Sequence, residues 1–303
     1  MFKGISQLRE GGRMSITDML NNYYTLTKSF YALNTIEVHG YYIREISKAC
    51  SFLKLANPHK LTLEHAYQIN EYFKGHGKKG NDTINKMFNY FKMVLKQNHI
   101  HTTFQEFPRL KVKTNHFMRL YHDDLKSLVQ YVINLNVNKN SICYKTAILL
   151  MIDSGCRLSE VINIKKRNID FYSDPMRIYL EDTKNGKSRY VPFSDFSKPY
   201  IKELIASHDH VELFWNFKFD TSFTKYCLRS FYRYTSKKLN IERLHSHRLR
   251  KTFASLLAEN GMSLYDLQLL LDHSRISTTQ LYVQTKQDRG LKSYTSHNNW
   301  KLN

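Results

Sequence analysis

The sequence predicts a mainly α-helical protein with a small antiparallel β-sheet, divided into two domains. Three observations support this prediction. The 303 residues exceed the usual size of a single domain. Apolar residues recur at helical spacing through most of the chain. Two short strand patterns, 177–180 and 189–192, flank Asn185-Gly186, a dipeptide that is a strong signal for a hairpin turn.

The first predicted domain covers residues 14–106 and contains four helical patterns without a strand pattern. Its helices are expected to begin at Ser15, at about Thr35, at Thr62 and at Asp82. Residues 1–13 contain Gly11-Gly12 and are expected to be flexible. This stretch is rich in Lys, Tyr and His, which suits either a helical bundle with a solvated basic face or a domain that lies on DNA.

Residues 107–118 are predicted to be a linker, because they combine Pro108 with basic residues and show no periodicity. The second domain is predicted over residues 119–285. In it a helix opens at Tyr121, an apolar helix ends at Gly155, and a helix over residues 224–238 carries Arg, Lys and Tyr side chains suited to phosphate contacts. Residues 286–303 form a tail.

The composition favours a polyanionic partner. Lys and Arg number 46 against 26 acidic residues, a formal net charge of +20. A generally basic protein without such a partner has the same composition. No apolar run is long enough to span a bilayer, and the N-terminus lacks a signal-peptide core.

No cofactor is expected from the sequence. The four cysteines form no C-x-x-C pair, so neither zinc nor a disulfide framework is indicated, and free thiols in a reducing cytosol are expected. There is no acidic cluster with Mg²⁺-site spacing and no Walker-type glycine loop. The cysteines are Cys50, Cys143, Cys156 and Cys227.

The stretch from His247 to Tyr282 is predicted to form three short helices that aim titratable side chains at one point. His247 and Arg250 lie one turn apart and therefore on one helical face. A capping pattern at Ser263 starts the second helix, which ends at Asp272-His273, and Ser277 caps the third.

This stretch resembles the signature of the tyrosine recombinase (phage integrase) family. The matching segments are His247-Arg248-Leu249-Arg250 with Thr252-Phe253-Ala254, then Leu271-Asp272-His273, then Thr278-Thr279-Gln280-Leu281-Tyr282. Two positions depart from the family pattern: Lys251 stands where a His is common, and Asp272 stands where a Gly is common. The Asp272 carboxylate is expected to raise the pKa of the neighbouring His273.

A second register also satisfies H-x-x-R, with His245 and Arg248. Leu249 before Arg250, and Thr252-Phe253-Ala254 after it, favour His247 and Arg250.

Upstream, Gly155-Cys156-Arg157-Leu158-Ser159-Glu160 resembles the family's G-x-R-x-S-E box. The resemblance implies that Arg157 is the first catalytic arginine and that Glu160 orients it through a charge-assisted pair. The family also carries a catalytic lysine in a β-hairpin. Lys184 fits that position best and Lys187 is the alternative, although a lysine at a hairpin tip is ordinarily only solubilising.

The resemblance implies an N-terminal helical core-binding (SAM-like) domain followed by a tyrosine-recombinase catalytic domain. It assigns catalysis to Arg157, Lys184, His247, Arg250, His273 and the nucleophile Tyr282. The Tyr282 phenol, with an ordinary pKa of about 10, would attack the phosphate and form a covalent phosphotyrosine. Two arginines would bind the non-bridging oxygens. The lysine would protonate the leaving 5′ oxygen, His247 would act as base or phosphate donor, and His273 as a second phosphate donor.

The implied function is site-specific DNA recombination, either integration and excision or resolution, through a 3′-phosphotyrosine intermediate and without metal or ATP. Implied partners are double-stranded recombination sites, a homo-tetramer on two duplexes with the tail docking in trans, and accessory proteins, with no membrane. The expected location is the cytoplasm, on the nucleoid. Residues 1–13 leave little room for the additional arm-site domain that some phage integrases carry, which favours a compact Xer-like or mobile-element enzyme. The alternatives are a type IB topoisomerase-like strand transferase and a DNA-binding protein that has lost catalysis.

Overall fold

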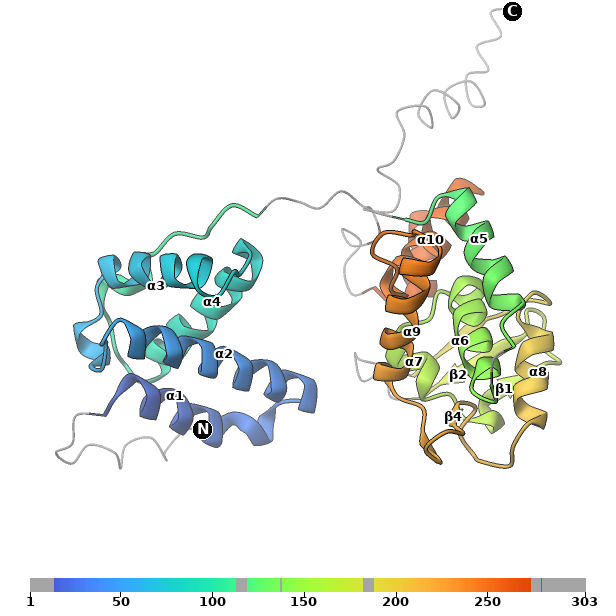
Figure 1. The fold of residues 1–303 in the computed structure, drawn as a ribbon, viewed down its shortest axis with the longest axis horizontal. Coiled ribbons are helices and arrows are strands. Elements are labelled where there is room, and N and C mark those ends of the chain that lie inside the picture. Colours follow the sequence, from blue (N-terminus) through green and yellow to red (C-terminus); the bar gives the residue numbers. More distant parts are fainter. Residues whose placement is uncertain (1–13, 113–118, 137, 182–187, 274–278, 280–303) are drawn as a thin grey trace, which may run out of the picture. The chain divides into compact units, whose positions relative to one another are not determined.

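The computed structural model describes residues 14–112, 119–136, 138–181, 188–273 and 279. The chain divides into two compact units, Met1–Thr114 and Asn115–Asn303 (Figure 1). Each unit has its own hydrophobic core. The boundary falls within the stretch predicted to be the linker. The predicted flexible N-terminus and the tail lie outside the described residues.

The first unit is a bundle in which α2 packs against α1, α3 and α4. Two of its helices begin at the predicted caps: the side chains of Ser15 and Thr62 accept hydrogen bonds from the backbone N–H groups of Asp18 and His65. The fourth helix begins slightly earlier than expected, after Gly80, so Asp82 lies in its first turn instead of capping it. The elements are α1 (Ile16–Thr27), η2 (Lys28–Phe30), α2 (Leu33–Phe52), η3 (Pro58–Lys60), α3 (Leu63–Gly75), α4 (Asn81–Gln97) and η4 (Thr103–Glu106).

The beginning of the predicted linker packs onto the first unit. Phe107 is buried and its ring stacks on Phe88 at a centroid distance of 4.4 Å. The Asn85 side chain exchanges two hydrogen bonds of 2.9 Å with the backbone of Leu110. An extended segment held by side-chain hydrogen bonds has no periodicity to detect, so the sequence alone could not distinguish it from a free linker.

The second unit is built around α6, which is buried on nearly every side and is contacted by α5, α8 and α10. A helix that is apolar all round belongs in the centre of a domain. The short helix α8 was not predicted. The helices are α5 (His122–Ile133), α6 (Ser141–Ser154), α7 (Leu158–Ile162), η5 (Lys166–Asn168), α8 (Lys198–Ala206), α9 (Lys225–Lys238), α10 (Ser246–Glu259) and α11 (Leu264–Leu271).

A three-stranded antiparallel sheet lies in the same unit, in the order β1-β2-β3. The predicted hairpin strands β2 (Arg177–Leu180) and β3 (Arg189–Pro192) pair with Ile178 opposite Val191 and Leu180 opposite Arg189. The two-residue strand β1 (Ile169–Asp170) was too short to predict. The connection between β2 and β3, residues 182–187, lies outside the described residues. A second sheet pairs β4 (Trp215–Asn216) with β5 (Thr221–Ser222).

None of the described helices is both long and apolar enough to cross a bilayer. Within the same residues no group of His, Cys, Asp and Glu side chains is arranged to hold a metal ion. The four cysteines are free thiols, three of them buried.

Candidate active site

The turn after α6 places Arg157. Gly155 ends α6 with a left-handed φ of 65°, and a Cβ atom on it would lie 2.3 Å from the Phe253 ring, so only glycine fits there. Arg157 then occupies the N-cap of α7. Its backbone N–H and its Nη1 donate to the two carboxylate oxygens of Glu160, at 2.7 and 2.6 Å. The expected charge-assisted pair between Arg157 and Glu160 therefore forms.

Three guanidinium groups meet at the C-terminal end of α11, and we call Arg157, Arg189 and Arg250 the arginine cluster. Together they donate to three successive carbonyls, and Arg157 shares the Leu271 carbonyl with Arg250 through a longer hydrogen bond of 3.3 Å. Arg189 donates to Leu270 at 2.5 Å, Arg250 to Leu271, and Arg157 to Asp272 at 2.8 Å. The last carbonyls of a helix lack partners within the helix and carry the negative end of its dipole, which explains why cations gather there.

Arg250 also ties α10 to the turn after α6, because its Nη1 donates to the Gly155 carbonyl at 2.8 Å. Only 1% of this residue is exposed. Segments more than a hundred residues apart in the sequence thus converge on α11.

The cluster carries more positive than negative charge among the described residues. Its carboxylate contacts are Glu160, which accepts from Arg189 at 2.9 Å, and Asp272, whose Oδ2 lies 3.4 Å from Arg157. Burial would raise the pKa of Glu160, but Arg189 and Arg157 outweigh it and hold that pKa below its ordinary value. Three guanidinium groups therefore face two carboxylates, an arrangement suited to an additional anion.

His273 follows α11 and lies between Arg250 and Thr279. Its Nε2 is 3.3 Å from Arg250 Nη2, and its Nδ1 is 3.0 Å from Thr279 Oγ1. A guanidinium can only donate, so Nε2 accepts and Nδ1 carries the proton of the neutral ring. Burial, followed by the charges of Arg250 and Arg157, lowers the pKa of His273 to about 4.

The expected rise in the pKa of His273 is therefore wrong. Asp272 does act in that direction, but burial and the two arginines outweigh it. Asp272 has left-handed backbone angles, φ 51° and ψ 52°, at the C-cap of α11. Glycine adopts this conformation at no steric cost, which explains why glycine is common at the position.

His247 lies in the first turn of α10 and is exposed. Desolvation of its inner side, followed by the charges of Lys251 and Arg250, lowers the pKa of His247 to about 4. His247 lies one helical turn before Arg250 on α10, and the charge of Arg157 also acts on its ring, so we assign it to the same site. At neutral pH both imidazoles are uncharged and can accept a proton.

The alternative register has a different environment. His245 caps α10, where its Nδ1 accepts from the backbone N–H of Arg248 at 3.2 Å. The Arg248 side chain donates to the carbonyls of Arg119 and Glu242, and no member of the arginine cluster contacts it in the described residues. The geometry favours His247 and Arg250.

Of the predicted site residues, the structure brings together Arg157, His247, Arg250 and His273. Lys184, its alternative Lys187, and Tyr282 lie outside the described residues. Sequence reasoning missed Arg189. One signal was available: on β3, Arg189 shares its face with the buried Val191, and an arginine on the inward face of a strand calls for an internal partner.

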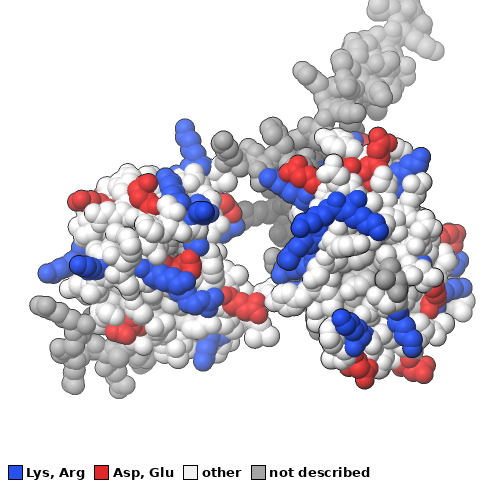
Figure 2. All heavy atoms as spheres, in the orientation of Figure 1, with Lys and Arg blue, Asp and Glu red and all other residues white. Residues whose placement is uncertain are grey.

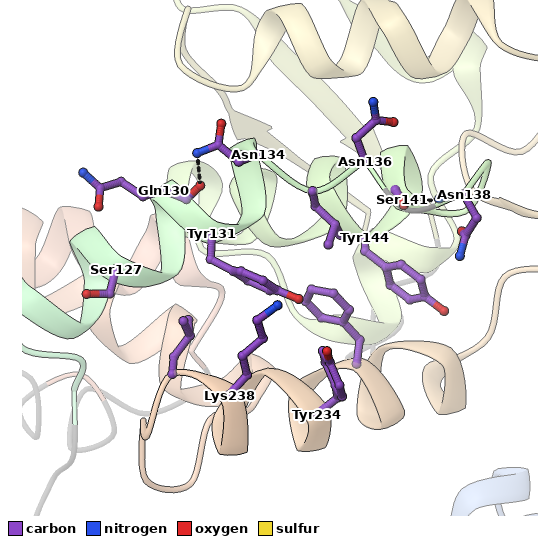
Figure 3. A pocket seen from close by; sticks show the side chains of 13 residues that line it. Ser127, Gln130, Tyr131, Asn134, Asn136, Asn138, Ser141, Tyr144, Tyr234 and Lys238 are labelled. Atoms are coloured by element: carbon purple, nitrogen blue, oxygen red, sulfur yellow. Dashed lines mark hydrogen bonds between the residues drawn. The ribbon is translucent and has the colours of Figure 1, made fainter.

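A cavity of about 760 Å³ lies elsewhere in the second unit, lined by residues of α5, α6, α9 and the α5–α6 connection (Figure 3). The Lys238 ammonium lies 4.8 Å from the centre of the Tyr131 ring, and Tyr144 stacks on Phe231. No member of the arginine cluster lines this cavity, so it is separate from the candidate active site.

Comparisons with known proteins show which proteins the chain is similar to. The model of the phage integrase family matches residues 118–289. A probable integrase/recombinase of Acholeplasma phage L2 is 42% identical over 291 residues, which cover 96% of this chain and 100% of that protein. Tyrosine recombinase XerA of Saccharolobus solfataricus is 33% identical over 144 residues, 48% of this chain and 46% of that protein.

Solved structures share the fold. The Tn1549 transposon integrase (residues 82–397) in complex with circular intermediate DNA matches with a TM-score of 0.75 and 18% identity, over 92% of this chain and 99% of that one. A lambda integrase dimer bound to a COC′ core site matches with a TM-score of 0.69 and 17% identity, over 94% and 81%. The predicted fold class, a helical N-terminal part followed by a mainly α catalytic part with small antiparallel sheets, is confirmed.

Proposed function

The chain belongs to the phage integrase family of tyrosine recombinases, and on this premise we propose that it cleaves and rejoins DNA strands at specific sites through a phosphotyrosine on Tyr282. The observation that carries the proposal is the convergence of the Arg157 and Arg250 guanidinium groups at the end of α11. A scissile phosphate is the anion that suits this pair, because its non-bridging oxygens can accept from both guanidinium groups.

The reaction proceeds by two transfers at one phosphorus atom. The Tyr282 oxygen forms a bond to phosphorus as the bond to the 5′ oxygen breaks. The phenol proton passes to a base, a role that we assign to His247, which is uncharged at neutral pH, and the departing 5′ oxygen takes a proton from Lys184. The 5′ hydroxyl of a second strand then attacks the phosphotyrosine, which releases the phenol and reseals the DNA without an energy source.

The helix α9 supports duplex DNA as the partner. Arg229, Arg233 and Lys237 are exposed and follow one another at intervals of four residues, so they form one basic stripe. The helix contains no acidic residue. Basic side chains gather over the region of α9 in Figure 2. Such a stripe suits contacts with successive phosphates, and the helices of the first unit add further contacts.

The biological setting is proposed from the relatives. The full-length relative is a probable phage integrase/recombinase, whereas XerA matches about half of the chain, which favours integration or excision of a mobile element over resolution. Four copies would act on two duplexes in the cytoplasm, with residues 286–303 docking on a neighbouring copy and accessory proteins directing the outcome. Deletion of residues 286–303 should then weaken assembly on paired sites without preventing binding to a single site.

The test is a nicked suicide substrate, which traps the covalent protein–DNA adduct. The wild type should form the adduct, and Tyr282→Phe should bind the DNA without forming it. A wild type that binds without an adduct would instead be an inactive DNA-binding protein. Joining of strands from two different duplexes distinguishes a recombinase from a topoisomerase-like strand transferase.

A further inference from the structure

We propose that Arg189 is a positioning residue of the strand-transfer site: it fixes Glu160 and the end of α11, and through them the phosphate-binding arginines. This inference rests on the proposed function. Arg189 contributes no group to the phosphate itself. It determines instead where Arg157 and the carbonyls that hold the cluster lie.

The first observation is that Arg189 bridges two elements. Its Nη2 donates to Glu160 of α7 at 2.9 Å, and its Nη1 donates to the Leu270 carbonyl of α11 at 2.5 Å. Only 12% of its side chain is exposed, compared with 21% for Arg157. Arg189 is thus directed into the protein, while Arg157 is the more accessible of the two.

The second observation is the chain of contacts that links Arg189 to Arg157. Glu160 Oε2 is shared between Arg189 and the backbone N–H of Arg157, and Glu160 Oε1 accepts from the Arg157 side chain at 2.6 Å. The Glu160 side chain is 4% exposed, so a change in one of its partners cannot be compensated easily by water.

Loss of Arg189 would therefore alter the balance at Glu160. The carboxylate would keep its charge but lose one guanidinium, and its remaining cationic neighbours are Arg157 and Arg250, whose Nη1 lies 4.0 Å away. Glu160 would then compete more strongly with the phosphate for both arginines. The Leu270 carbonyl would also lose its donor, which would loosen the end of α11 that precedes His273.

The third observation concerns the position of Arg189 in the sheet. It lies opposite Leu180 on the last described pair of the β2–β3 hairpin. The two strands lead to the segment that contains Lys184 and Lys187. Arg189 thus ties the described base of this hairpin to α7 and α11, and the three elements keep one relative arrangement.

The experiment compares Arg189→Gln and Arg189→Lys with the full-length wild type on a nicked suicide substrate at saturating DNA. We expect Arg189→Gln to lower the single-turnover cleavage rate constant on the order of 10²-fold, with DNA affinity and final adduct yield close to wild type. Arg189→Lys restores the charge but cannot reach both acceptors. Its rate constant should therefore be about tenfold above that of Arg189→Gln and still about tenfold below that of the wild type.

A double-variant cycle separates positioning from independent action. If Arg189 acts through Glu160, then Glu160→Gln combined with Arg189→Gln should be no slower than the slower single variant by more than about threefold. Multiplied rate losses would overturn the proposal. So would an Arg189→Lys variant at the wild-type rate, or a variant that lowers only the adduct yield, which is the signature of fewer folded molecules.

If Arg189→Gln does not fold, the test uses Arg189→Lys alone. Its rate constant is then compared with that of the wild type, provided that the two proteins have the same melting temperature. Failure of the proposed function is a separate outcome, because the wild type in the same assay would then form no Tyr282-dependent adduct.

Discussion

Helix α10 contributes two buried arginines, Arg248 and Arg250, to two different regions of the second unit. The two regions differ in how they neutralise the arginine's charge. Arg248 and Arg250 are 3% and 1% exposed. Arg248 faces the start of α5, where it donates to backbone carbonyls and lies 3.6 Å from Asp124. Nearby, Arg119 pairs with Glu259 at 2.6 Å, so each arginine of this region has a carboxylate partner.

Among the described residues, the region of Arg250 has fewer carboxylates than arginines. Arg157, Arg189 and Arg250 share Glu160 and Asp272, and the two adjacent histidines are held uncharged. Burial alone therefore does not distinguish a structural arginine from a functional one. We expect a functional arginine to be one whose charge the described surroundings neutralise only in part, because an excess of buried positive charge is costly until an anion binds.

The largest effect should come from Arg250→Gln. This change removes a permanent charge from the arginine cluster, so we expect the cleavage rate constant to fall by roughly 10²- to 10³-fold. Stability should change little, because the lost hydrogen bonds are offset by reduced repulsion with Arg157 and Arg189. Single-turnover cleavage and thermal unfolding measure the two quantities. A large loss of stability with unchanged cleavage per folded molecule would mean that the two regions do not differ.

The matched change in the other region is Arg248→Gln. It leaves the Arg119 and Glu242 carbonyls without their donor, and we expect the free energy of unfolding to fall by about 2 kcal/mol. Cleavage per folded molecule should remain within about threefold of wild type. Denaturant unfolding measures the free energy of unfolding. Single-turnover cleavage, corrected for the number of active molecules by the adduct yield, measures cleavage per folded molecule. A drop in the rate constant comparable to that of Arg250→Gln would contradict the assignment.

The sequence could assign these arginines only by pattern. Both satisfy H-x-x-R, and the flanking Leu249 and Thr252-Phe253-Ala254 selected the register that the geometry favours. Local signals also predicted the caps of α1 and α11, the end of α6 and the β2–β3 pairing, because those depend on neighbouring residues. The meeting of Arg157 with Asp272 could not be predicted this way, since the two are 115 residues apart.

The prediction for the pKa of His273 was wrong for a related reason. A neighbouring carboxylate is visible in the sequence, whereas burial and two distant guanidinium groups are not. Arg189 was overlooked because its short strand gave no helical or motif signal, although its inward position on β3 is consistent with an internal role.

DNA binding to the region of Arg250 should depend on pH. The folded pKa values of His247 and His273 are about 4, below the ordinary 6.5. Between pH 6.5 and pH 4 these histidines are protonated in the unfolded chain but not in the folded protein. The free energy of unfolding therefore falls as the pH drops from about 6.5 to about 4. A bound phosphate raises both pKa values. DNA binding then takes up protons, and affinity should rise by up to about tenfold per histidine between pH 7 and pH 5.

Affinity measured across this range at constant salt tests the prediction. His247→Gln and His273→Gln should each remove part of the pH dependence. His245→Gln is the control. Burial, followed by the charges of Lys251 and Arg248, lowers the pKa of His245 too, but this residue caps α10 outside the arginine cluster. The prediction is wrong if all three variants keep the wild-type slope.

The smallest effect should come from changes at Asp272. Its carboxylate partly neutralises the arginine cluster, as the carboxylates near Arg248 and Arg119 do in the other region. Its carboxylate lies 3.4 Å from Arg157, at a position where a phosphate oxygen would compete for the same guanidinium. Asp272→Asn removes the charge and keeps a side chain that tolerates left-handed angles. The pair is partly exposed, so the gain should be modest, and we expect about a threefold to fivefold faster cleavage at low salt.

Asp272→Gly separates charge from backbone strain. It removes the carboxylate and also suits the left-handed φ of 51°. If charge is the cause, the Asn and Gly variants should be accelerated equally, and the gain should shrink as salt screens the contact. If only Asp272→Gly is faster, the backbone conformation at the end of α11 limits the site, and the carboxylate is not a competitor of the phosphate.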